Sequence, residues 1–185
     1  MKNYELVLML NVSVAEAERK KFLSELESKY KMLDKDDIGV KELSFLLKGR
    51  VSQAYFVSYL VELSASAIGD LKQYLLYNQN LIRYELFTRE TGTEFFHFDK
   101  LQSAFDPAIE EIKDKRYGQK VNFFTKKSNE KYLNRKSVAI LKHYLTRFGD
   151  IKPRAYTGNS VSTQKKLRTE IIRARTLGFL PFIKK

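Results

Sequence analysis

The chain has 185 residues, 43% of them hydrophobic and 13% aromatic, which is enough to bury a core in one ordinary domain or in two small ones. It contains no cysteine, so disulfides and thiolate metal sites are excluded. The formal net charge of +12 is uneven, because residues 1–112 contain 14 Lys+Arg and 18 Asp+Glu, whereas residues 113–185 contain 20 and 4. Such a cationic C-terminal part indicates a polyanionic partner, either a nucleic acid or an anionic membrane surface.

The N-terminal residues show no basic leader and no cleavage site before the first apolar segment. No apolar run approaches the roughly 18 residues of a transmembrane helix. We therefore expect a soluble cytoplasmic protein without a membrane partner.

Residues 1–90 alternate between strand and helix patterns. The predicted elements are a strand at 4–10, a helix at 14–33, strands at 38–48 and 53–63 joined by a turn at Gly49-Arg50, a helix capped by Ser64–Ser66 and ending near Tyr77, and a strand at 80–90. This βαββαβ order predicts an α+β architecture that begins with a ferredoxin-like domain. Such a domain has a four-stranded antiparallel sheet with both helices on one face.

The third predicted strand carries two tyrosines, Tyr55 and Tyr59, on either side of Val57. RNA-recognition modules share the βαββαβ order and stack bases on sheet aromatics. Their signature begins with a basic residue and a glycine, which Gln53-Ala54 does not match. We therefore expect Tyr55, Val57 and Tyr59 to pack in the sheet or to form an interface with a second domain.

Three segments of residues 1–90 resemble the family of bacterial small-subunit ribosomal protein six (S-six). They are Tyr4-Glu5, Leu43-Ser44-Phe45 and the strand from Tyr55-Phe56 to Val61-Glu62, and the lengths of the helices and strands also agree. The resemblance covers about half of the chain.

Residues 91–120 break the alternation and are predicted to be a linker between a domain at 1–90 and a domain at 121–185. A flexible chain of about 30 residues spans roughly 30 Å, which allows the second domain to dock beside the first. The aromatic cluster at 95–98 predicts that parts of the linker are pinned, and Ile109 and Ile112 after Pro107 predict a short helix. Because His97 has no second His or Cys nearby, we expect packing or exposure rather than catalysis or metal binding.

Residues 121–185 predict a small, mostly α-helical basic domain. A first helix at 136–148 is predicted from an apolar stripe, and Gly149 is a good helix stop. The stripe consists of Val138, Leu141, Leu145 and Phe148.

The last helix, at about 161–178, has the most informative pattern. At 100° per residue, with Lys165 at zero, its apolar positions fall between about 120° and 240°, as a core-facing stripe should. These positions are Leu167, Ile171, Ala174 and Leu177. The rest of the helix carries five cations with a nearby acid only at Glu170, unlike the mixed charges of an ordinary solvated face. The pattern favours contacts with phosphates, for which the planar fork of arginine is well suited.

Five segments of this domain resemble the small-subunit ribosomal protein eighteen (S-eighteen) family: Val138–Lys142, Gly149–Arg154, Thr157–Ser160, Gln164–Leu167 and Arg173–Phe182. The two resemblances together imply a fusion of proteins that are usually separate, associate as a heterodimer and bind the central domain of 16S rRNA on the platform of the small subunit. They also imply intramolecular docking of the two halves, and neighbouring ribosomal proteins of the eleven and fifteen families as partners. Some S-eighteen members bind zinc through cysteines that this chain lacks, so we expect no metal and no cofactor.

We therefore predict a non-catalytic structural constituent of the small ribosomal subunit, in a bacterial or an organellar ribosome. The chain has no Gly-rich phosphate loop, no metal-spaced His or Cys set and no local context for a catalytic triad. The alternative is an extraribosomal translational regulator or RNA chaperone that uses the same surface. The predicted rRNA-binding residues are Arg154, Thr157, Gly158, Gln164, Lys165, Lys166, Arg168, Arg173 and Arg175.

Overall fold

The computed structural model describes residues 2–47, 51–89, 94–113 and 123–183. The chain divides into two compact units, Met1–His97 (unit 1) and Phe98–Lys185 (unit 2). This division falls within the range 91–120 that the sequence assigns to a linker. The predicted turn at Gly49-Arg50 lies outside the described residues.

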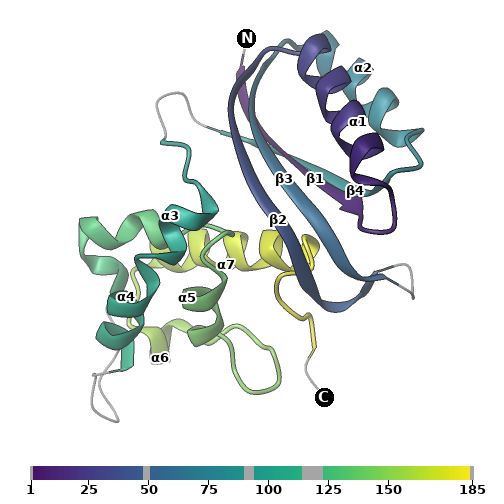
Figure 1. Ribbon diagram of the computed structural model, residues 1–185. Helices are drawn as coiled ribbons and strands as arrows, with labels where there is room; N and C mark the ends of the chain where they lie inside the picture. Colours follow the sequence, from purple (N-terminus) through teal and green to yellow (C-terminus); the bar gives the residue numbers. More distant parts are fainter. Residues whose placement is uncertain (1, 48–50, 90–93, 114–122, 184–185) are drawn as a thin grey trace. The chain divides into compact units, whose positions relative to one another are not determined.

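Unit 1 has the predicted βαββαβ order. Its elements are β1 (Lys2–Asn11), α1 (Glu16–Lys29), β2 (Met32–Leu47), β3 (Val51–Leu63), α2 (Ala65–Leu76) and β4 (Leu81–Thr88). The strands form one sheet in the order β2-β3-β1-β4, and each neighbouring pair is antiparallel. Both helices lie on one face of this sheet (Figure 1). The predicted ferredoxin-like arrangement is therefore confirmed.

The two helices begin near the predicted positions, but α1 ends earlier than predicted. Ser64 caps α2, because its side-chain oxygen accepts a hydrogen bond from Ala67 N–H at 3.3 Å. Helix α1 stops at Lys29, since the backbone pairs with β3 from Met32 onward. The predicted helical position of Leu33 is wrong, because strand pairing draws this residue into β2, where it is 46% exposed.

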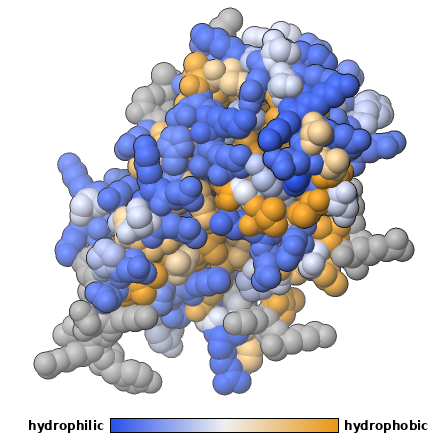
Figure 2. Space-filling view, in the orientation of Figure 1, coloured by the Kyte–Doolittle hydropathy of each residue, from blue (hydrophilic) through white to orange (hydrophobic). Residues whose placement is uncertain are grey.

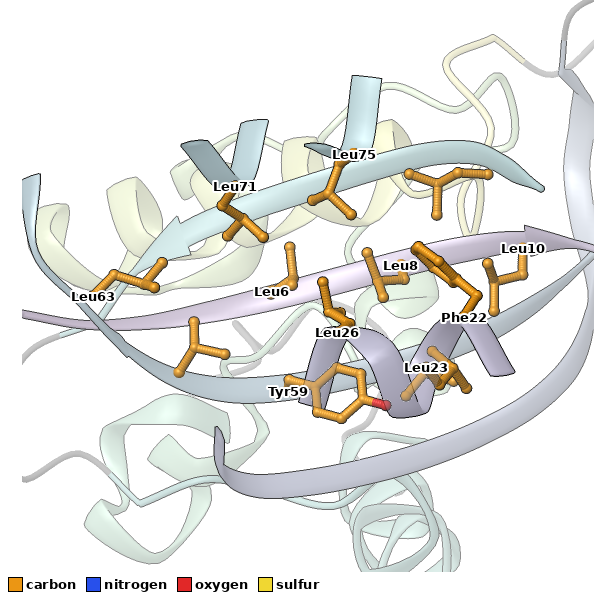
Figure 3. Close-up of a cluster of buried hydrophobic side chains, with 13 residues drawn as sticks. Leu6, Leu8, Leu10, Phe22, Leu23, Leu26, Tyr59, Leu63, Leu71 and Leu75 are labelled. Carbon is orange, nitrogen blue, oxygen red and sulfur yellow. The ribbon is translucent and has the colours of Figure 1, made fainter. Parts of the chain in front are cut away.

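The core of unit 1 lies between the sheet and the two helices (Figure 3). Alternate residues of β1 and β3 point to the helix-covered face, where they meet one apolar stripe from each helix. The buried residues are Leu6, Leu8, Leu10, Phe22, Leu23, Leu26, Val57, Tyr59, Val61, Leu63, Leu71, Leu75 and Leu81. Each fully buried leucine contributes about 1.5–3 kcal/mol through the hydrophobic effect.

Two of the three residues expected at an interdomain interface lie in this core instead. The side chains of Val57 and Tyr59 are fully buried, because their alternation points them toward the helices. The Tyr59 hydroxyl donates to Glu27 Oε1 at 2.7 Å, and burial together with this carboxylate raises the pKa of the phenol. Tyr55 points to the same face and is half-buried, with its hydroxyl donating to Asp37 Oδ2 at 2.6 Å.

The opposite face of the sheet carries apolar side chains around one buried carboxylate. Register pairing places Val7, Met9 and Phe56 on this face. Beside them, Glu5 accepts a hydrogen bond from Ser58 Oγ at 2.9 Å and forms an ion pair with Arg89 at 2.7 Å. This face therefore combines apolar side chains with a hydrogen bond and an ion pair to Glu5.

The segment after β4 is pinned to unit 1, as its aromatic residues predict. The Phe95 and His97 rings meet edge to face, with 5.4 Å between their centroids. His97 Nε2 lies 3.2 Å from Asp34 Oδ2, and the Arg89 guanidinium lies 5.8 Å from the centroid of Phe95. Within the described residues, the His97 side chain therefore packs against Phe95 and lies beside Asp34.

Unit 2 consists of short helices and one longer helix. Its elements are α3 (Phe98–Gln102), α4 (Phe105–Lys113), the 3-10 helices η1 (Phe123–Thr125) and η2 (Lys127–Tyr132), α5 (Val138–His143), α6 (Arg154–Thr157) and α7 (Val161–Thr176). The mostly helical character predicted for the basic domain is confirmed. The short helix predicted after Pro107 is part of α4.

Helix α5 is much shorter than the predicted helix at 136–148. It ends at His143, and Leu145 forms a β-bridge with Ile151 across a turn that contains Gly149 with φ of +95°. The predicted stripe is consequently wrong beyond Leu141, and Phe148 is 57% exposed. The bridge satisfies backbone groups locally and competes with continuation of the helix.

Hydrophilic side chains cover most of the molecular face shown in Figure 2. Within the described ranges, no helix combines the length and the apolarity needed to cross a membrane.

Candidate nucleic-acid interface

Helix α7 is fastened to unit 2 by the predicted apolar stripe. Leu167, Ile171 and Ala174 are 0% exposed and Leu177 is 1% exposed, which confirms that the stripe faces the core. Ser160 caps the helix, because its hydroxyl oxygen accepts a hydrogen bond from Thr163 N–H at 3.2 Å. The α7 positions outside this stripe therefore face away from the core, on a helix that is held firmly in place.

One groove lies between α7 and the loop that precedes α6. It has a volume of about 770 Å³ and is lined by Asp150, Ile151, Lys152, Pro153, Arg154, Val161, Gln164, Lys165 and Arg168. We call it the loop groove. Arg154, Lys165 and Arg168 are exposed, so cations stand on both of its walls. Such a surface attracts phosphate groups through charge and through guanidinium geometry.

A second groove lies on the other side of α7, against η2. It has a volume of about 490 Å³ and is lined by Glu130, Leu133, Ser162, Lys165, Lys166, Thr169, Glu170 and Arg173. We call it the η2 groove. Its cations are partly neutralised, since Lys166 Nζ lies 3.3 Å from Glu130 Oε1 and Arg173 Nη1 lies 2.5 Å from Glu170 Oε1.

Three of the predicted RNA-binding residues hold the turn before α7 together. Thr157 is 2% exposed and donates from Oγ1 to Gln164 Oε1 at 2.9 Å. Gln164 Nε2 donates to the Lys152 carbonyl at 2.9 Å. Gly158 ends α6 with φ of +67°, a conformation that favours glycine. The side chains of Thr157 and Gln164 are thus hydrogen-bonded within the unit, and Gln164 also lines the loop groove.

The Arg175 side chain also forms hydrogen bonds within unit 2. Its Nε donates to the Pro181 carbonyl at 3.1 Å, and its Nη2 donates to the Gly149 carbonyl. Burial lowers the pKa of this guanidinium. Arg175 therefore ties the turn at Gly149 to the segment after α7, and it lines neither of the two grooves.

A buried polar cluster that the sequence pattern did not reveal anchors α7. Arg135 and Lys136 are 4% and 2% exposed, although two adjacent cations usually indicate a solvated position. Glu170 accepts a hydrogen bond from Arg135 N–H at 2.9 Å, and its carboxylate lies 3.6 Å from Arg135 Nη1. The isolated acid among the cations of α7 was the available signal, because a lone carboxylate in such a helix suggests a buried counter-ion.

The described residues contain no group of three His, Cys, Asp or Glu side chains that could hold a metal ion. Helix α7 itself presents cations and hydrogen-bond donors to the two grooves. This combination suits noncovalent binding of an anionic polymer.

Comparison with known proteins places unit 2 in a family. Residues 129–180 match the family model described as Ribosomal protein S18. The chain is 40% identical over 73 residues to small ribosomal subunit protein bS18 of Mycoplasma capricolum, covering 96% of that relative and 40% of this chain. It is 44% identical over 52 residues to bS18 of Lactobacillus delbrueckii, covering 67% of that protein and 28% of this chain.

Among solved structures, a crystal structure of 30S ribosomal protein S6 from Thermotoga maritima is similar to this chain. The TM-score is 0.44 at 15% identity, and the match covers 57% of this chain and 96% of that chain. The ferredoxin-like fold of unit 1 is established by its own strand order. The near-complete coverage of a bS18 relative, together with the family model, shows that the chain belongs to the ribosomal protein S18 family.

Proposed function

We propose that the chain is a non-catalytic structural constituent of the small ribosomal subunit that binds rRNA through α7 and the grooves beside it. One observation carries the proposal: the segment that matches the S18 family contains α7, whose apolar stripe is buried while four of its five cations line two surface grooves. Unit 2 contains 21 Lys+Arg and 8 Asp+Glu, so its formal charge is +13. A polyanion is the matching partner.

The binding mechanism is electrostatic docking followed by shape complementarity. Arg154, Lys165, Lys166, Arg168 and Arg173 contact phosphates, and their cations displace the counterions of the RNA. The remaining predicted residues position these five. Structured RNA is recognised mainly through shape, ribose and phosphate, so base specificity is limited. The target that the family resemblance implies is the central domain of 16S rRNA at the platform.

Unit 1 acts in this proposal as an S-six-like partner carried on the same chain. The sheet face away from its helices carries the buried apolar side chains of Val7, Met9 and Phe56, and we propose that unit 2 docks on unit 1. Covalent linkage replaces a bimolecular association by an intramolecular one, at an effective concentration on the order of millimolar. Contacts with neighbouring proteins of the eleven and fifteen families belong to the same proposal.

The proposal is tested by measuring binding of the full-length chain to a 16S rRNA central-domain fragment over a range of salt concentrations. A variant with Arg154→Ala, Lys165→Ala and Arg168→Ala should bind more weakly. The slope of log K against log salt should also become shallower, by roughly 0.7–0.9 for each lost phosphate contact. A matched control removes three exposed cations of unit 1, Lys20→Ala, Lys21→Ala and Lys72→Ala, and should keep the wild-type slope.

Binding to the fragment no tighter than to unrelated RNA of the same length would refute the rRNA assignment. Sedimentation adds an independent readout, because a ribosomal constituent should remain with small subunits in moderate salt. A translational regulator or RNA chaperone would instead be found on its own target RNA without ribosomes.

A further inference from the structure

Helix α7 is a ridge between two grooves, and the two grooves share only Lys165. Arg168 lines the loop groove, and Arg173, five positions later in the sequence, lines the η2 groove. At 100° per residue, these two side chains leave the helix about 140° apart. Apart from Arg175, which lines neither groove, the cations that the sequence presents as one basic surface therefore lie on two sides of α7, with Lys165 common to both.

Each groove has a second wall that does not come from α7. The loop groove is closed by Asp150–Arg154, so Arg154 stands across from Arg168. The η2 groove is closed by Glu130 and Leu133, so Lys166 stands across from Glu130 and contacts it at 3.3 Å. A polyanion seated in one groove is thus enclosed by that groove's own walls.

We propose that two separate backbone segments of the RNA straddle α7, one in each groove, with Lys165 on the ridge between them. The inference rests on the proposed function and adds the form of RNA that this surface takes. An α-helix with its side chains is about 10–12 Å wide, so it is thick enough to hold two phosphate backbones apart. Adjacent backbone segments of a folded RNA, such as those that flank a shallow minor groove, meet this requirement.

The two grooves differ in charge, which predicts unequal contributions. The loop groove has four cations, Lys152, Arg154, Lys165 and Arg168, against Asp150. The η2 groove has three cations against two acids, and both acids are within 3.3 Å of one of those cations. Phosphates that bind in the η2 groove must displace these carboxylates from the cations. The loop groove should therefore contribute more to the salt dependence of the RNA-binding constant.

The test is hydroxyl-radical footprinting of the 16S central-domain fragment with the full-length chain. One variant carries Arg154→Ala and Arg168→Ala, and the other carries Lys166→Ala and Arg173→Ala. Each is used at a concentration that saturates binding, and circular dichroism checks that each retains wild-type helix content. Lys20→Ala with Lys21→Ala is the control with the same change of charge.

We expect each variant to lose protection at a different backbone segment while it keeps protection at the other. The slope of log K against log salt should fall by roughly 1.4–1.8 for the loop-groove variant, which loses two cations, and by less for the η2-groove variant. Loss of the same nucleotides in both variants, or a change in only one of them, would overturn the two-segment arrangement and leave rRNA binding intact. A wild-type chain without any footprint would refute the proposed function itself.

Discussion

Replacing Glu170 tests whether one buried carboxylate anchors the RNA-binding helix. Glu170 accepts the Arg135 N–H at 2.9 Å and lies within ion-pair distance of the side chains of Arg135 and Arg173. Removing one partner of a buried ion pair typically costs about 3–5 kcal/mol, since the remaining charge loses its counter-ion. We expect Glu170→Ala to destabilise unit 2 by about this amount, and Glu170→Gln by less, because the amide oxygen still accepts from the backbone.

Glu130 provides a matched control on the same surface. Its ion pair with Lys166 is exposed, with side-chain exposures of 62% and 64%, and exposed pairs contribute about 0–1 kcal/mol. The assay is native-state hydrogen exchange at the buried α7 amides of Leu167 and Ile171, which reports the free energy of opening. A loss of 3–5 kcal/mol corresponds to roughly 10²–10⁴-fold faster exchange. Equal effects of Glu170→Ala and Glu130→Ala, or less than about 1 kcal/mol for Glu170→Ala, would refute the anchoring role.

Three further predictions follow from the hydrogen bonds. Burial and Asp37 raise the pKa of Tyr55 to about 12, and burial and Glu27 raise that of Tyr59 further. The neutral phenols therefore stabilise unit 1 fully below the unfolded-state pKa of about 10, and this contribution should decline as pH rises from 10 to 12. Tyrosinate absorbance during alkaline unfolding checks this, and replacing both tyrosines by phenylalanine should flatten the profile. Arg175→Ala should lower the melting temperature of unit 2 more than Arg168→Ala and weaken RNA binding less, as calorimetry and binding titrations would show. Ser160→Ala should cost about 1 kcal/mol of α7 stability in hydrogen exchange, through loss of the N-cap, and no cost would argue against that cap.

Unit 1 was predictable because its signals are local. Alternation in β3 and helical spacing in α2 are properties of neighbouring residues, and they led to the correct order of elements and the correct sheet class. The error at Leu33 has a nonlocal cause, since pairing with β3 decides where β2 begins. The placement of Val57 and Tyr59 depended in the same way on which sheet face the helices cover.

For unit 2, the sequence pattern was enough to predict the buried stripe of α7, the cationic character of its remaining surface and the short helix after Pro107. Periodicity suffices for such features, because it follows from the geometry of one helix. The sequence pattern did not predict that Arg175 binds carbonyl groups, that Glu170 contacts Arg135, or that the other cations of α7 line two different grooves. Those assignments depend on partners distant along the chain, and no spacing rule within α7 specifies which side chains from other elements will lie beside it.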